Sequence, residues 1–114
     1  MVNLSNRYEF VIIDLKVWRG EGSIKELLKQ AFVDHVTGQE ALVVCQVLSR
    51  NADFIAVVDQ VRDLVEGHPQ SAGPLSRLSY EGSREVLHEG RVRIRDSNVP
   101  LLISYVNLHR STGE

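Results

Sequence analysis

Three arginines, Arg91, Arg93 and Arg95, alternate with β-branched residues. This alternation has the period of a β-strand, in which successive side chains point to opposite faces. Guanidiniums on one strand face repeat about every 6.6–6.8 Å, a spacing that can follow the phosphates of a nucleic acid. Arginines are equally typical of a solvent-facing strand, where they keep it soluble or pair with acids such as Glu89 and Asp96. The segment therefore predicts a basic strand face, and phosphate binding is one of its two interpretations.

A second candidate site for an anion is the segment in which Gly20, Gly22 and Ser23 join an expected strand to an expected helix. Free amides and the helix dipole at such a junction attract negative charge, and Arg19 and Lys25 would add positive charge. An acidic residue in the same loop opposes this, and a short Gly-x-Gly occurs in many ordinary turns. We expect a tight turn here, with an anion site as the alternative.

No other group of residues indicates a reaction. The histidines show no paired ligand spacing, so we predict neither a metal nor a cofactor. The single cysteine, Cys45, lies in an apolar run and is expected to be a buried, inert thiol. Asp14 shares a strand face with Lys16, which predicts a surface ion pair, and His88 lies among apolar positions, which predicts a half-buried imidazole. We identify no catalytic residue.

Composition limits the remaining classes. The 114 residues are 43% hydrophobic, enough for one domain over residues 1–114 that buries a core without disulfides. The net charge of −2 provides no general attraction to nucleic acid or anionic lipid. We expect no membrane span, because no window approaches the roughly 18 apolar residues that one needs. Together with the lone cysteine and a start that lacks the apolar core of a signal peptide, this predicts a cytoplasmic protein.

The elements that must position these residues follow from periodicity. Apolar residues alternate over 8–18 and are continuous over 41–48, which predicts two strands. Helical spacing follows Ser23, which with Glu26 would form a capping box, and a second helix over 54–66 would be capped by Asp53. Beyond the loop 68–74, alternation predicts three more strands, the last two over 85–95 and 99–108.

The order is therefore β-α-β-α-β-β-β. The first β-α-β unit should be a parallel crossover and the C-terminal strands should pair antiparallel. The expected fold class is α+β (mixed α/β), a mixed sheet with two helices mainly on one face.

Such a sheet would leave its second face uncovered. In the strand over 8–18, Val11, Ile13, Leu15 and Val17 form an unbroken apolar face, which we assign to the core beneath the helices. The opposite parity is also apolar at its start, as are alternate residues of the last strand. We assign these residues to the uncovered face and expect them to form an interface: Tyr8, Phe10, Ile12, Trp18, Leu101, Ile103 and Tyr105.

The leading hypothesis is a non-enzymatic interaction and assembly module that self-associates through this apolar face, as a homodimer or with another protein. Each large side chain buried there would gain roughly 1.5–3 kcal/mol. The first alternative is a nucleic-acid-binding module that uses the three arginines; the net charge and the lack of an aromatic pair beside them disfavour it. The second is a small enzyme or binder of an anionic ligand at the Gly20–Ser23 turn.

Overall fold

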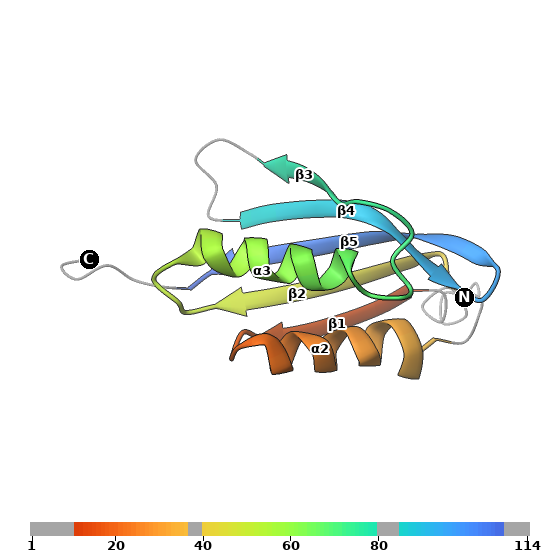
Figure 1. The fold of residues 1–114 in the computed structure, drawn as a ribbon, viewed down its shortest axis with the longest axis horizontal. Helices are drawn as coiled ribbons and strands as arrows, with labels where there is room; N and C mark the ends of the chain where they lie inside the picture. The colour runs from red at the N-terminus through yellow and green to blue at the C-terminus, as the bar shows by residue number, and fades with distance from the viewer. Residues whose placement is uncertain (1–10, 37–39, 80–84, 109–114) are drawn as a thin grey trace, which may run out of the picture.

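The strands and helices form two layers, a sheet and a pair of helices (Figure 1). The structure is a computed structural model and describes residues 11–36, 40–79 and 85–108. The strands are β1 (Val11–Val17), β2 (Leu42–Ser49), β3 (Ser76–Ser79), β4 (Glu85–Ile94) and β5 (Ser97–Asn107). The helices are α2 (Glu21–Lys29), continued by the π-helical turn η1 (Gln30–Asp34), and α3 (Phe54–Glu66). The predicted α+β class and element order are confirmed.

The sheet has the order β1-β2-β5-β4-β3. β1, β2 and β5 are parallel, and β4 and β3 are added antiparallel beside β5. The last strand of the chain therefore lies at the centre of the sheet, which suits its strongly apolar sequence. β1 and β3 form the two edges.

Helix α3 has the bounds that its sequence predicts. Asp53 caps it, because the side chain accepts a hydrogen bond from the Ala56 amide at 3.1 Å. Its buried side is a stripe of four valines: Val57, Val58, Val61 and Val65. A helical repeat with an N-cap residue is therefore sufficient to locate this element.

Helix α2 begins differently from the prediction. Its N-cap is Gly20, whose φ of 95° is a conformation that favours glycine, and no side chain caps the helix. The Ser23 hydroxyl donates to the Gly20 carbonyl at 2.7 Å and accepts from the Arg19 amide at 3.0 Å. Glu26 instead binds the Lys16 ammonium at 3.0 Å. The predicted capping box is wrong because both of its side chains serve the turn and the strand before the helix.

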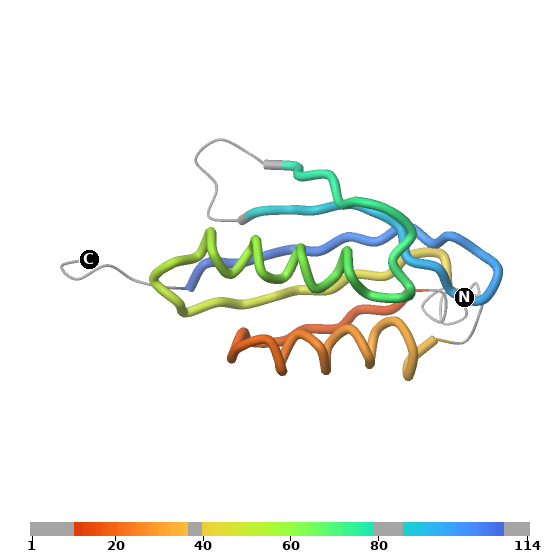
Figure 2. Tube along the Cα trace, viewed as in Figure 1, coloured from red at the N-terminus to blue at the C-terminus, as the bar shows by residue number. Residues whose placement is uncertain are grey.

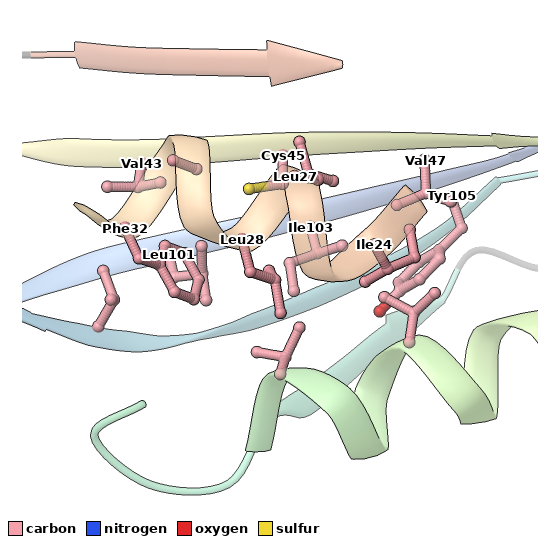
Figure 3. Packing of buried hydrophobic residues seen from close by; sticks show 14 of the residues in the cluster. Ile24, Leu27, Leu28, Phe32, Val43, Cys45, Val47, Leu101, Ile103 and Tyr105 are labelled. Carbon is pink, nitrogen blue, oxygen red and sulfur yellow. The ribbon is translucent and has the colours of Figure 1, made fainter. Parts of the chain in front are cut away.

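Both helices cover the same face of the sheet. Figure 1 shows α2 in front of β1 and α3 in front of the central strands, and the backbone trace in Figure 2 shows the same layering. The buried apolar side chains lie between the layers (Figure 3). Those labelled on the sheet come from β2 and β5: Val43, Cys45, Val47, Leu101, Ile103 and Tyr105. The expectation of two helices on one face is confirmed.

The predicted assignment of the two sheet faces is wrong. Ile12, Leu101, Ile103 and Tyr105 do share one face, but they are at most 7% exposed and lie in the core beneath the helices. Trp18 is half-buried and packs against that core, whereas Tyr8 and Phe10 lie outside the described residues.

The physical reason lies at the edge of the sheet. Asp14 and Lys16 share the parity of Ile12, and their polarity suggested a solvent-facing side. Because β1 is an edge strand, both side chains reach polar groups of the helical layer. Asp14 lies 3.1 Å from a His35 ring nitrogen, and Lys16 binds Glu26. The helical layer can therefore cover the face that carries the charges.

Candidate functional site

The sheet face opposite the helices is the most unusual surface of the molecule, and we call it the open face. Strand register defines which residues belong to it, because paired residues point to the same side. Its members are Val11, Ile13, Leu15 and Val17 of β1, Leu42, Val44, Gln46 and Leu48 of β2, Pro100, Leu102, Ser104 and Val106 of β5, and Leu87, Glu89, Arg91 and Arg93 of β4, with Asn98, Ser76 and Leu78 at its margins.

Several large apolar side chains on this face are exposed to solvent. Ile13 is 72% exposed and Leu15 is 55% exposed, the two highest values among the exposed large hydrophobic residues of the described chain. Leu78 on the far edge is 37% exposed. Between these edges the apolar residues of β2 and β5 are half-buried, except Pro100, which is exposed. No described helix or loop lies across the middle of the face, so the described part of the chain provides no covering layer for its apolar side chains.

Two polar residues interrupt the apolar surface near its centre. Gln46 of β2 pairs with Ser104 of β5, and Leu15 of β1 pairs with Gln46. The next level along the sheet is apolar across three strands, with Ile13, Val44 and Leu102 in register. The open face is therefore apolar over β1, β2 and most of β5 apart from Gln46 and Ser104, and it is polar and charged along much of β4. An apolar area with a polar margin is typical of a surface that packs against another protein layer.

The arginines lie at one corner of this face. Arg91 and Arg93 point to the open side, opposite Pro100 and Asn98 of β5, and both are exposed. Arg95 is not part of a strand ladder, because it occupies the two-residue hairpin turn with a φ of 56°. The structure therefore brings two of the three predicted guanidiniums onto one strand face. Glu89 lies on the same face one step along the strand, so the basic surface is short and directly flanked by a carboxylate.

A hollow of about 520 Å³ lies beside Arg91. Its floor is the open face of β2, β5 and β4, and its wall is the segment from Ala72 to Ser76, which runs along the outer side of β4. On the helical side of β4, the Leu75 side chain of that segment packs over Gly90, where an added Cβ would lie 2.6 Å from a Leu75 methyl carbon. Glycine at this position therefore allows the wall to stand close against the sheet.

The Gly20–Ser23 turn has the geometry of a structural turn. The Ser23 hydroxyl is already engaged with Gly20 and Arg19, as described above. Lys25 lies 3.8 Å from Glu21, one helical turn earlier, so part of its charge is neutralised. Arg19 and Gly22 are exposed. The turn brings the predicted residues Arg19, Gly22, Ser23 and Lys25 near one helix start, but the serine and the lysine have local partners.

Two groups that could in principle take part in catalysis have structural roles in this molecule. The Asp14 carboxylate lies 3.1 Å from Nδ1 of His35, an arrangement that can orient an imidazole. Cys45 pairs with Asp14 across β1 and β2 and is a buried, free thiol. Burial, with a smaller effect of the Asp14 charge, raises the pKa of Cys45 to about 12. A thiol that stays protonated is a poor nucleophile, which matches its expected inert role.

The other two described histidines pack against aromatic rings. His88 is 2% exposed, and its Nδ1 lies 2.8 Å from the Tyr105 hydroxyl beneath α3. Burial, and then the charges of Arg62 and Arg77, lower the pKa of His88. His68 packs edge-on against Phe32, and its Nδ1 accepts a hydrogen bond from a backbone amide. Burial lowers its pKa as well. Both rings are components of the core or its rim.

Sequence reasoning missed the importance of Ile13 and Leu15, because it assigned them to the core. The unbroken apolar parity from Val11 to Val17 did indicate an apolar face, and only its direction was misassigned. Over the described residues there is no cluster of three or more potential metal ligands, and no helix is long and apolar enough to cross a membrane. Comparison of the chain with protein-family models, with curated proteins and with solved structures finds no match.

Proposed function

We propose that this chain is a non-enzymatic assembly module that forms a homodimer by packing the open faces of two copies against each other. The observation that carries the proposal is the exposure of Ile13 and Leu15, 72% and 55%, in the middle of a β1 face that is apolar along its whole length. In water these side chains have an unfavourable hydration free energy, and a second apolar layer removes it.

The size of the face suits a dimer. Five strands span about 24 Å across and a seven-residue strand is about 23 Å long, so the footprint is roughly 550 Å². The largest apolar patch on a typical monomer is about 300–600 Å², and a standard interface buries about 800 Å² of accessible surface on each partner. The footprint of the whole face, its polar positions included, is therefore of the same order as one side of a standard interface.

The architecture also suits this packing. Two sheets stack face to face at about 10 Å, with side chains of both inner faces interdigitating. A dimer formed this way would have four layers, with helices outside and the two sheets inside. Its single cysteine is a free thiol in the core, which fits a reducing compartment such as the cytoplasm.

The test is the mass of the full chain in solution. Sedimentation velocity and light scattering from low to high micromolar concentration should give a dimer for the natural sequence. Leu15→Glu should give a monomer, because two carboxylates would have to be buried in the interface. Ile55→Glu is the matched control, since Ile55 is 51% exposed on α3 in the helical layer, and this variant should remain dimeric.

A monomer at every concentration for the natural sequence would overturn the proposal. Equal dimerisation of Leu15→Glu and the natural sequence would overturn it too, because the interface would then lie elsewhere. Far-UV circular dichroism and urea unfolding of each variant separate loss of association from loss of folding.

A further inference from the structure

The outer edge of β1 presents backbone groups that have no partner among the described residues. The Trp18 amide donates to the Leu48 carbonyl of β2 at 2.8 Å, which fixes the direction of the amides along the strand. Since successive amides of a strand point to opposite edges, those of Ile13, Leu15 and Val17 point away from β2. No hydrogen bond joins these three amides to another described residue. This edge can therefore accept a further strand.

The opposite edge of the sheet is less suited to strand addition. β3 has only four residues and follows Pro74 closely. The seven residues of β1 pair with β2 in an uninterrupted register and include no proline. Short edge strands and prolines are the features that prevent a further strand from pairing. Of the two edges, β1 is therefore the one that a partner strand can extend.

A hollow of about 540 Å³ lies along this edge, between the end of β1 and the start of α2. It is lined by Leu15, Lys16, Val17, Arg19, Ser23 and Glu26. Lys16 and Glu26 are paired with each other, and the Ser23 hydroxyl serves the turn. Arg19 is exposed, and its guanidinium makes no ion pair with another described residue. The hollow therefore combines outward amides and apolar side chains with one unpaired positive charge.

We propose that the edge of β1 binds an extended segment of another protein, in which apolar and polar residues alternate and an acidic residue lies beside Arg19. Side chains on one side of that segment would pack against Ile13 and Leu15, because adjacent strands place side chains of the same face next to each other. Backbone hydrogen bonds would supply the affinity, and these side chains and the acid would supply the sequence preference. The edge and the open face are separate surfaces, so this inference does not depend on the proposed dimer.

A second copy of the chain does not fit this edge. Paired strands lie about 4.7–4.9 Å apart, and α2 lies in front of β1 itself (Figure 1). Pairing β1 with the β1 of a second copy would therefore bring two α2 helices closer than the roughly 8–10 Å that packed helices need. An extended segment without a helix of its own avoids this clash. The geometry thus favours a peptide-like partner over self-association at this edge.

Two synthetic hexapeptides test the edge in the isotopically labelled full chain. One is acetyl-Glu-Thr-Val-Thr-Val-Thr-amide and the other is acetyl-Thr-Val-Thr-Val-Thr-Glu-amide, so that the acid can reach the arginine whether the added strand is antiparallel or parallel to β1. One of them should bind at submillimolar concentration and slow the hydrogen exchange of the Ile13, Leu15 and Val17 amides, measured by nuclear magnetic resonance. The exchange of the Asp14 and Lys16 amides, which face β2, should not change.

A proline at an outward amide separates edge binding from binding elsewhere. Val17→Pro removes one outward N–H and breaks no hydrogen bond to β2, and an edge strand tolerates a proline at such a position. It should weaken the peptide about tenfold or more. Val17→Ala is the matched control, because it shortens the same side chain and keeps the amide, and it should bind the peptide nearly as well as the natural sequence. Urea unfolding establishes that both variants are folded.

The charge is tested with a second pair of variants that leave the strand unchanged. Arg19→Gln should weaken the peptide about two- to fivefold, as expected for an exposed ion pair. A peptide with glutamine in place of its glutamate should bind the natural sequence and Arg19→Gln equally. Lys29→Gln, which removes an exposed charge at the other end of α2, is the control and should leave the affinity unchanged.

Three results would overturn the inference. The first is that neither peptide binds up to millimolar concentration. The second is binding that both Val17→Pro and Arg19→Gln leave unchanged, because the peptide would then occupy another surface. The third is slow exchange of the outward β1 amides in the peptide-free chain that is lost on dilution, because a second copy would then be the occupant of the edge.

Discussion

Replacing Ile13 by threonine should weaken the proposed dimer by a calculable amount. The change keeps a β-branched residue in the strand, so the fold loses little, and it removes the equivalent of two methylene groups. Burial of a methylene gains about 0.8 kcal/mol, and 72% of the Ile13 side chain is available for burial by a partner, which gives about 1.2 kcal/mol per copy. A symmetric dimer contains the change twice, so we expect a loss of about 2.3 kcal/mol, or roughly 50-fold in Kd.

Sedimentation equilibrium over a wide concentration range measures this Kd for the natural sequence and for Ile13→Thr. Val33→Thr is the control, because Val33 is 51% exposed on η1, in the helical layer. Its Kd should stay within a factor of about two of the natural value, since surface substitutions outside an interface have small effects. If Ile13→Thr and Val33→Thr gave the same Kd, the reasoning from exposed area on β1 would be refuted.

Four further outcomes test the fold that holds this face in place. Lowering the pH below about 6.5 should reduce the free energy of unfolding, because the pKa values of His68 and His88 are lowered in the folded protein and the unfolded chain then binds more protons; urea unfolding at several pH values measures this. Tyr105→Phe should cost about 1–3 kcal/mol in the same assay, since it leaves the buried His88 nitrogen without its partner. Cys45 should react with a thiol reagent only after unfolding, because its pKa is raised to about 12. Asp53→Ala should lower stability by about 1 kcal/mol through loss of the α3 cap, and an unchanged urea midpoint would contradict that role.

Much of the fold could be predicted from local patterns. The order of strands and helices follows from periodicity, and the bounds of α3 follow from a valine stripe between Asp53 and Gly67. The start of α2 could not be predicted in the same way. Ser23 and Glu26 fit a capping box locally, but their actual partners are Gly20 and Lys16, and the lysine becomes a neighbour only when the helix packs on β1.

The assignment of the two sheet faces to core and solvent failed for a different reason. Local patterns correctly placed Ile12 with Leu101, Ile103 and Tyr105 on one side of the sheet, yet they could not say which side the helices cover. Both faces of β1 are apolar enough to be core, so hydrophobicity alone does not decide between them. The position of β1 at the sheet edge decides, and strand order depends on long-range pairing that one sequence does not show.

The polar contacts of β1 also determine how a second copy can approach. Lys16 with Glu26, and Asp14 with His35, join the helical side of the strand to α2 and η1, so that side is occupied. A partner strand added along the edge of β1 would pair backbone groups, but Ile13 and Leu15 would still face water on the open side. Only a layer stacked on the open face removes both side chains from water. Because the unfavourable hydration of this molecule is on the face and not at the edge, stacking of two sheets is the mode of association that its side chains favour.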